Sequence, residues 1–446
     1  MRGFSSSIHH PIIRTPDTRF VRVVDPTLPA AQHLVGKQAV DVLRLPVEAA
    51  GGRIEDVRPV HVQFRPGSDV IVRYSAQISW DGQPSVRETL VASSTAWGVH
   101  PGTVVITADT SDGPIEVGVW RWPFDPALRG LGAVVSAESV GSLLDLDPRH
   151  LVVDIVAYRP TERAVIRVSS TVVEGNGDPS EHVHAYIKVV EPSTAQAIAD
   201  RHGCLLAAGV AVPAVNTIDE ANGLLVLEPL RGPTLRQLVK GAPGAWPTTD
   251  EFDRLADSFA AADLAGGSVP SKLTDGALHA HMLASVLPLP AQRSRLEALA
   301  TIFEQTPIPP ADSIIHGDLH EAQLIIVDGM IRGVLDIDDA GPGAAIDDRA
   351  NLIARLLYRT VVADMDTTTI VTYADMVRSE STRRFDAHQL DVHIAACLIG
   401  LATGPFRLQA PGWERNVTDL VECAEHLTMR ELSDSTHRGL TQPCAT

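Results

Sequence analysis

The stretch that decides the fold is HGDLHEAQLIIVDGMIRGVLDID, residues 316–338. Its second part holds two short apolar runs around the Asp-Gly pair at 328–329, which is the strongest hairpin signal in the chain. A hairpin there brings Asp336 back beside the loop that carries Asp318 and Gln323. The stretch is therefore expected to gather two carboxylates and one carboxamide in one place.

These side chains have the chemistry that phosphoryl transfer needs. That reaction uses a carboxylate to orient the attacking hydroxyl and accept its proton, and oxygen ligands for the magnesium that bridges the phosphates. Asp318 and Gln323 are five residues apart on one tight loop, so they can point to opposite sides of the reacting phosphoryl group. Asp336 adds a second carboxylate, and magnesium prefers such oxygen donors.

The stretch resembles the signature of the aminoglycoside-phosphotransferase and choline-kinase branch of the protein-kinase-like fold. That signature is H-G-D-x-H-x-x-N, a hairpin, I-D-[FW], and then D-[LI]-A. Here Gln323 stands where the family mostly has Asn, the hairpin ends at Asp336, and residues 348–350 read DRA. The resemblance implies that Asp318 is the catalytic base and that Gln323 and Asp336 bind Mg²⁺.

The same resemblance extends to two more residues and meets one clear departure. It places His320 in the nucleotide site and makes Asp348 an anchor of the loop. Gln323 carries its oxygen one methylene further out than Asn, which can shift or weaken the metal. Actinobacterial maltokinases and glucosamine kinases are similar in having Gln in that place and an extra N-terminal cap. This similarity favours a sugar or amino sugar as the acceptor.

Residues 146–230 resemble the small nucleotide-binding lobe of the kinase-like fold. Lys188 looks like the strand lysine that contacts the α- and β-phosphates of ATP or GTP, although a lone strand lysine can also be a solvated edge residue. Arg159 lies in the turn expected over the phosphates, which has no glycine here. Glu228 and Leu230 resemble the hinge that hydrogen-bonds adenine; the alternative is an edge strand that enters a loop.

The expected fold class is α+β: a protein-kinase-like two-lobe fold with an additional N-terminal α+β cap domain. The expected parts are the cap, the small β-rich lobe, and a large helical lobe with the catalytic loop and the acceptor site, at residues 1–145, 146–230 and 231–446. FRPGSDVIVR at 64–73 and YRPTERAVIR at 158–167 recur at an offset of 94. With three identical positions this is either a weak internal repeat or a coincidence.

Charge and hydropathy narrow the partners. The net charge of −18 argues against nucleic acid, which selects basic surfaces. It suits a cationic acceptor such as an amino sugar, although an acidic surface more often only keeps a protein soluble. No apolar run approaches the roughly 18 residues that span a bilayer, and the first residues lack a signal-peptide pattern. We therefore expect a cytoplasmic monomer or homodimer without membrane contact.

The leading hypothesis is a Mg²⁺-dependent kinase that uses ATP, or GTP, to phosphorylate a hydroxyl of a sugar, amino sugar or aminoglycoside. The alternative is a catalytically weak, nucleotide-binding pseudokinase with a regulatory role. The Gln in place of Asn and the missing glycine turn favour that alternative. Asp338 and Asp339 are either a site for an ammonium group of the acceptor or caps of the following turn.

Overall fold

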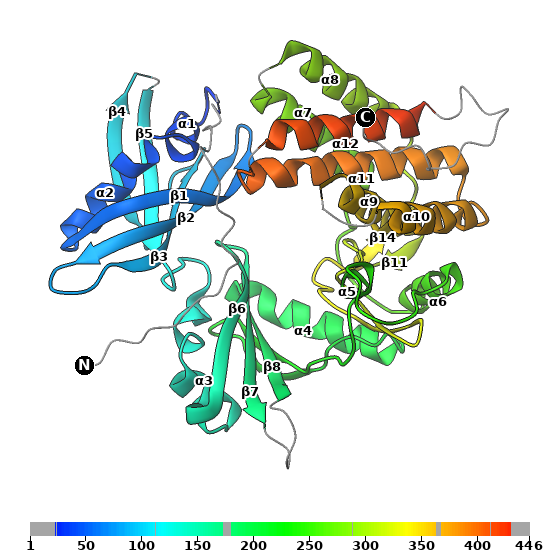
Figure 1. The fold of residues 1–446 in the computed structure, drawn as a ribbon, viewed down its shortest axis with the longest axis horizontal. Coiled ribbons are helices and arrows are strands. Elements are labelled where there is room, and N and C mark those ends of the chain that lie inside the picture. Colours follow the sequence, from blue (N-terminus) through cyan, green and yellow to red (C-terminus); the bar gives the residue numbers. More distant parts are fainter. Residues whose placement is uncertain are drawn as a thin grey trace.

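The computed structural model is drawn as a ribbon in Figure 1. The residues that it describes are 23, 25–111, 113–172, 180–287, 289–362, 367–410 and 412–429. These residues form two five-stranded antiparallel sheets, one after the other in the sequence, and then a mainly helical part. The predicted α+β class is confirmed.

The first sheet follows two short helices, α1 (Ala30–Val35) and α2 (Ala39–Ala49). Its strands are β1 (Gly52–Arg65), β2 (Asp69–Trp80), β3 (Val86–Thr95), β4 (Val104–Thr110) and β5 (Gly113–Arg121). Along much of β2, buried and partly exposed side chains alternate, because successive residues of a strand point to opposite faces. Buried Tyr74 donates a hydrogen bond to the Leu34 carbonyl (2.6 Å), which fastens α1 to the sheet.

The second sheet follows helix α3 (Ala137–Leu144), whose N-cap Ser136 accepts a hydrogen bond from the Ser139 amide. Its strands are β6 (Leu151–Arg159), β7 (Arg163–Val172), β8 (Ser180–Val190), β9 (Val215–Asp219) and β10 (Leu224–Leu227). Helix α4 (Pro192–Ala207) connects β8 to β9 and packs on the sheet. Figure 1 shows this sheet below the first one, with the helical part beside both.

The two sheets have the same strand order. It is β1-β2-β3-β5-β4 in the first sheet and β6-β7-β8-β10-β9 in the second. The two copies of the weak repeat are the hairpins that open each sheet, closed by the pairs Arg65–Asp69 and Arg159–Arg163. The shared topology supports a true repeat over coincidence. The first sheet differs by having no helix between its third and fourth strands.

The remaining described elements are mostly helices that pack on one another. They are α5 (Leu235–Val239), α6 (Thr249–Ala260), α7 (Lys272–Val286), α8 (Pro290–Gln305), α9 (Ala345–Val362), α10 (Thr367–Ser381), α11 (Ala387–Arg407) and α12 (Trp413–Thr428). Two short antiparallel pairs lie among them: β11 (Ser313–Ile315) with β14 (Gly341–Gly343), and β12 (Leu324–Val327) with β13 (Met330–Val334).

Helix α11 is the core helix of this part and contacts α7, α9 and α12. By length and composition it could cross a membrane, a feature that inspection of apolar runs missed. However, 78% of its apolar window is buried inside the fold, as in the core helix of a soluble domain. The C-terminal end of α11 reaches the first sheet, and α11 contacts β1 (Figure 1).

Candidate active site

The loop after β11 is held by one carboxylate. Asp348, at the start of α9, accepts hydrogen bonds from the backbone amides of His316 (2.6 Å) and Gly317 (2.9 Å). Gly317 has a φ of +85°, and a side chain there would meet the Asp339 carbonyl at 2.8 Å. Asp348 therefore fixes the sharp turn from which Asp318 projects.

His316 ties the loop to the far end of the hairpin. Its ring is fully buried, and Nε2 lies 2.9 Å from the Leu335 carbonyl oxygen. Its Nδ1 accepts a hydrogen bond from the Asp318 amide (3.2 Å). Since Leu335 directly precedes Asp336, this one imidazole sets the position of both aspartates.

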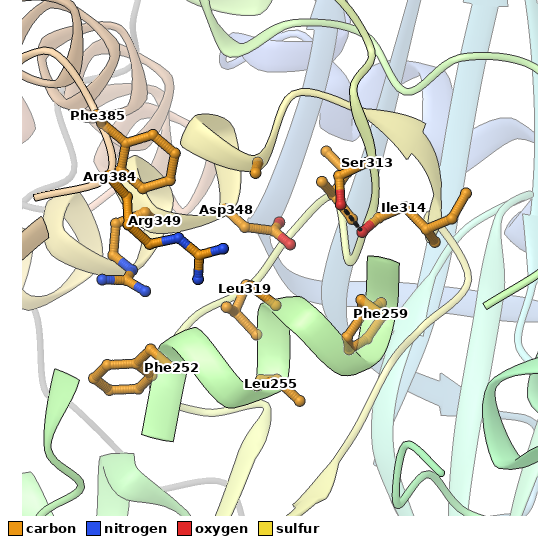
Figure 2. Close-up of a pocket in the computed structure, with 13 residues that line it drawn as sticks. Phe252, Leu255, Phe259, Ser313, Ile314, Leu319, Asp348, Arg349, Arg384 and Phe385 are labelled. Atoms are coloured by element: carbon orange, nitrogen blue, oxygen red, sulfur yellow. Dashed lines mark hydrogen bonds between the residues drawn. The ribbon is translucent and has the colours of Figure 1, made fainter. Parts of the chain in front are cut away.

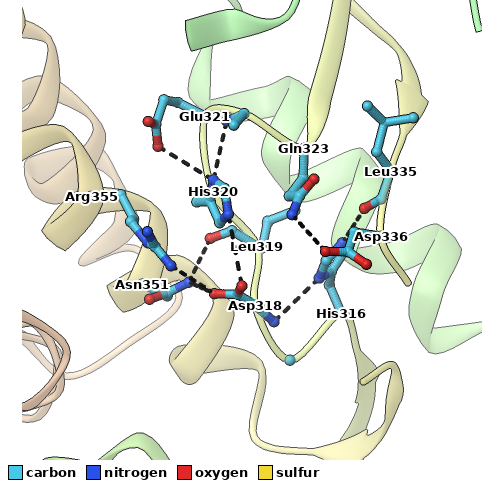
Figure 3. Close-up of polar contacts among 12 residues, drawn as sticks. His316, Asp318, Leu319, His320, Glu321, Gln323, Leu335, Asp336, Asn351 and Arg355 are labelled. Carbon is cyan, nitrogen blue, oxygen red and sulfur yellow. Dashed lines mark hydrogen bonds and ion pairs between the residues drawn. The ribbon is translucent and has the colours of Figure 1, made fainter. Parts of the chain in front are cut away.

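The carboxylate of Asp318 lies among donors from α9 (Figure 3). Its Oδ1 accepts from Asn351 Nδ2 (3.0 Å) and from an Arg355 guanidinium nitrogen (3.3 Å). Burial by itself raises the pKa of Asp318, but Arg355, His320 and Lys272 outweigh it and hold that pKa below the usual value. Asp318 is therefore a carboxylate at neutral pH, as a proton acceptor must be.

The structure brings Gln323 and Asp336 together. Gln323 Nε2 lies 3.3 Å from Asp336 Oδ2, and the Leu335 amide donates to the Gln323 carbonyl (2.8 Å). Rotating the Gln323 amide by half a turn would present its oxygen beside the carboxylate instead of its nitrogen. The pair then offers two hard oxygen donors from neighbouring backbone segments, even though the Gln side chain is one methylene longer than that of Asn.

Lys188 reaches the same carboxylate from the second sheet. Its side chain, on β8, is almost fully buried, and Nζ lies 3.0 Å from Asp336 and 2.5 Å from Asp338. Arg163, at the start of β7, pairs with Asp336 as well (2.7 Å). Burial raises the pKa of Asp336, but Lys188 and Arg163 reverse this and hold it far below its usual value. The second sheet and the helical part thus meet at Asp336.

Residues assigned to the nucleotide by sequence are dispersed around this meeting point. His320 lies against the loop itself: its Nδ1 accepts from the Ala322 amide (3.1 Å), and its Nε2 is 3.7 Å from Asp318 Oδ2. This geometry suits positioning of Asp318 better than contact with a nucleotide.

At the hinge, the Glu228 amide already donates to the Ala214 carbonyl (2.9 Å). Residue 229 is proline and has no backbone N–H, so the next backbone N–H donor after Glu228 is that of Leu230.

The turn that contains Arg159 is held from outside the second sheet. Thr161, in that turn, has a φ of +62°, a conformation that glycine usually takes. Buried Asp125 accepts from the Thr161 amide (2.9 Å) and from the Tyr158 hydroxyl (2.8 Å). Arg159 itself is about half exposed and lies 4.0 Å from Glu162. A carboxylate thus holds the turn where kinase-like folds often use glycine.

Similarity to known proteins gives independent support for the enzyme class. Residues 186–383 match the phosphotransferase enzyme family. The matched segment holds Lys188, the 316–323 loop and Asp336. It leaves out the first sheet, the Arg159 turn and the end of α11. The match confirms the predicted enzyme class, phosphotransferase, for this segment. No curated protein matches the chain.

Several solved structures resemble the chain at low identity. Aminoglycoside phosphotransferase APH(4)-Ia, with ADP and hygromycin B, is 13% identical over 67% of this chain and 99% of its own, with a TM-score of 0.44. Macrolide 2'-phosphotransferase MphH from Brachybacterium faecium is 18% identical over 67% and 100%, with a TM-score of 0.38. A choline/ethanolamine kinase family protein from Mesorhizobium loti is 12% identical over 62% and 87%, with a TM-score of 0.40.

The phosphotransferase segment has a small apolar hollow behind the loop (Figure 2). It is lined by Phe252, Leu255, Phe259 and Leu319, with Asp348 and Arg349 at one side. Arg349 is anchored there by Asp253 and Ser381, both at 2.6 Å. None of the expected nucleotide or metal residues lines it. The hollow is part of the packing that supports the loop. Arg349, at the position where the signature has an apolar residue, lines this hollow.

Sequence reasoning missed Arg163, Asn351 and Arg355, which the structure places in this site. Arg163 carries no local signal, because its partner Asp336 lies 173 positions away in the sequence. Asp338, expected either to hold an ammonium group of the acceptor or to cap a turn, pairs with Lys188 in the structure (2.5 Å). Both carboxylates lie beyond the end of β13, and Asp336 has a φ of +56°, so the alternation of a strand does not account for their common direction.

Proposed function

We propose that this protein is a Mg²⁺-dependent kinase that transfers the γ-phosphoryl group of ATP, or GTP, to a hydroxyl of a small sugar-like acceptor. The observation that carries the proposal is the meeting of Asp318, Gln323, Asp336 and Lys188 on one loop, one hairpin and one facing strand. Gln at position 323 and the additional N-terminal sheet support a sugar or amino sugar kinase of the maltokinase or glucosamine kinase type. An aminoglycoside is a third acceptor of this class.

The roles follow from the geometry. Asp318 accepts the proton of the acceptor hydroxyl, and Asn351 and Arg355 hold its carboxylate in place. Lys188 binds the phosphates, and Leu230 donates its backbone N–H to adenine. Arg159 lies in the turn over the phosphates. His320 keeps Asp318 oriented.

The donors present fit a magnesium ion. Carboxylate oxygens of Asp336 and the amide oxygen of Gln323 are hard ligands, and Asp336 is ionised because cations surround it. When bound, magnesium neutralises charge on the phosphates. In the structure described here, the negative charge of Asp336 is balanced by ion pairs with Lys188 and Arg163.

A second candidate function is nucleotide binding without turnover, in a regulatory pseudokinase. One observation favours it: Arg163 and Lys188 each pair with both Asp336 and Asp338, so metal binding has to compete with four ion pairs. Titration calorimetry with Mg·ATP separates the candidates. Binding without ADP release across a broad set of hydroxyl acceptors supports the pseudokinase.

The test of the leading function is ADP release from Mg·ATP with a panel of sugars, amino sugars and aminoglycosides. Asp318→Asn should lose at least about 10²-fold, the lower end for positioned proton transfer. Asp328→Asn is the matched control, because Asp328 is exposed at the hairpin tip and Asn also tolerates its φ of +53°. The control should keep full activity.

A further inference from the structure

The peptide unit that joins Gly317 to Asp318 is held at both of its polar atoms. The Asp318 N–H donates to His316 Nδ1 (3.2 Å), and the Gly317 carbonyl accepts a hydrogen bond from Lys272 Nζ (2.5 Å). A peptide unit is planar, so bonds to its oxygen and to its N–H fix the orientation of the whole unit. The Cα of Asp318 belongs to this unit, so the same two bonds direct the Asp318 side chain.

These bonds act where the backbone of the loop is least restricted by itself. Gly317 has a φ of +85°, and glycine adopts many backbone conformations at little cost. Asp348 holds the amides of His316 and Gly317, which precede the Cα of this glycine. Those two bonds do not restrain rotation about the bond from that Cα to the Gly317 carbonyl carbon. The bonds from Lys272 and His316 restrain it.

The backbone of Lys272 is fixed by its place in the fold. Lys272 is the first residue of α7. Three residues before it, the Val269 amide donates to the Pro342 carbonyl of β14 (2.7 Å). One turn after it, Gly276 packs so closely on α11 that a Cβ there would lie 2.7 Å from the Ala396 methyl group. The Lys272 side chain therefore joins the catalytic loop to a closely packed helix end.

Lys272 is a cation that bonds to the backbone and not to a carboxylate. It makes no ion pair with any residue in the part of the chain that the structure describes. Burial lowers its pKa, but the acidic groups around it, foremost Cys397, Asp318 and Asp275, outweigh burial and hold that pKa above its usual value. The amine is therefore protonated at neutral pH, and its hydrogen bond to the Gly317 carbonyl is charge-assisted, which makes it stronger than a neutral one.

We infer that Lys272 is a positioning residue for the catalytic base: its ammonium group holds the Gly317 carbonyl and so keeps the Asp318 carboxylate aimed at the acceptor hydroxyl. The inference rests on the proposed function and adds a residue that acts through the backbone of the loop. With Asp348 on the amides, Lys272 holds the loop between α7 and α9. A loop that turns freely at Gly317 displaces Asp318, and a displacement of about 1 Å can slow a reaction about 10²-fold.

Lys272→Met tests the inference, because it keeps a long side chain and removes the ammonium group. ADP release should show kcat lowered by about 10- to 100-fold, with the KM of ATP and the KM of the acceptor unchanged. Lys272→Arg keeps a charged donor of a different shape and should recover part of kcat. Lys240→Met, at an exposed lysine that follows α5, is the matched control and should behave as the wild type. If Lys272→Met does not fold, Lys272→Gln, whose side chain is shorter and neutral, replaces it under the same criteria.

Hydrogen exchange of the backbone amides at 316–320 is a second readout that needs no turnover. These amides should exchange faster in Lys272→Met than in the wild type or Lys240→Met, because the loop opens more often. Faster exchange, with no acceptor phosphorylated by the wild type, defeats the kinase proposal and leaves the restraint on the loop standing. An unchanged kcat in Lys272→Met overturns the inference and leaves the kinase proposal intact. A lowered kcat with unchanged exchange, or a raised KM with unchanged kcat, also overturns it, because Lys272 would then act directly on a substrate.

Discussion

The two sheets have one strand order and do two different things. In the second sheet Lys188 stands opposite Val165 and reaches Asp336; in the first, the equivalent partner of Ile71 is Ser93, fully buried and without a hydrogen bond. The first sheet also has no helix between its third and fourth strands. The same framework therefore carries a lysine that pairs with Asp336 in one copy and a buried serine in the other.

The opening hairpins of the two sheets are held in the same way. Thr161 and Gly67 occupy equivalent turn positions and both have a positive φ, +62° and +73°. An upstream aspartate accepts the amide in each case: Asp125 for Thr161 (2.9 Å) and Asp25 for Gly67 (2.7 Å). The common device is a carboxylate that clamps a left-handed turn. The two sheets therefore share their turn geometry as well as their strand order.

The largest expected effect is a difference in activity between substitutions at equivalent positions in the third strand of each sheet. Lys188→Met should lower kcat/KM by about 10²- to 10³-fold, as expected when a preorganised charge at the phosphates is removed. Ser93→Ala, at the equivalent position of the first sheet, should leave activity unchanged. Steady-state ADP release measures both. An equal loss in the two variants would mean that the sheets do not differ in this function.

Next in size is the clamp of the second sheet. Asp125→Ala strands the Tyr158 hydroxyl and the Thr161 amide without their acceptor, so unfolding should require about 2–3 kcal/mol less free energy. The turn near Arg159 should loosen with it, and the KM of ATP should rise. Urea unfolding and ATP titration are the measurements, with Asp81→Ala at an exposed turn as control. A stable variant with an unchanged KM contradicts the clamp.

The turn residues themselves can be exchanged. Gly67→Thr should destabilise the protein by about 1–2 kcal/mol, because a side chain disfavours the left-handed region. Its nearest neighbour would be the Thr27 hydroxyl at 3.8 Å, so crowding is not the cause. Thr161→Gly should stabilise the protein, because glycine tolerates the positive φ. The gain should be smaller than the loss in Gly67→Thr, because glycine also gives the unfolded chain more freedom, which opposes folding. Thermal unfolding of both variants checks the opposite signs.

The smallest expected effect is a pH dependence at the clamp of the first sheet. Burial raises the pKa of Asp25, but hydrogen bonds from Gly67 and Thr27 outweigh it and hold that pKa below its usual value. A lowered native pKa stabilises the fold above the unfolded value of about 4, and the gain is lost as pH falls through the native pKa. The stability difference between wild type and Asp25→Asn should shrink below about pH 4. It should be under about 1 kcal/mol, since Asp25 is largely solvated.

Much of the central site could be predicted because its residues are close in sequence. The Asp-Gly turn at 328–329 fixes the hairpin, and the hairpin brings Asp336 to Gln323. Partners from distant segments carried no such signal. Arg163 reaches Asp336 because the second sheet packs on the helical part, and Arg355 reaches Asp318 because α9 packs beside the loop. Periodicity describes local structure, and it does not say which elements meet.

Local errors had local causes. The apolar run at 212–215 reads as a strand in the sequence, but β9 begins only at Val215. Pro213 lacks an N–H for a sheet, and its carbonyl is taken by His202 Nδ1 (2.7 Å). Similarly, the net charge of −18 describes the whole chain, and an average over the composition does not show that Lys188 and Arg163 gather at Asp336.

The most direct test of the central claim follows the label of γ-³²P-ATP in wild type and Asp318→Asn, with magnesium and a mixed panel of hydroxyl acceptors. The account predicts transfer of label to an acceptor in the wild type, and transfer slower by at least about 10²-fold in the variant. Label found only in ATP and inorganic phosphate, or equal transfer by the two proteins, would contradict it.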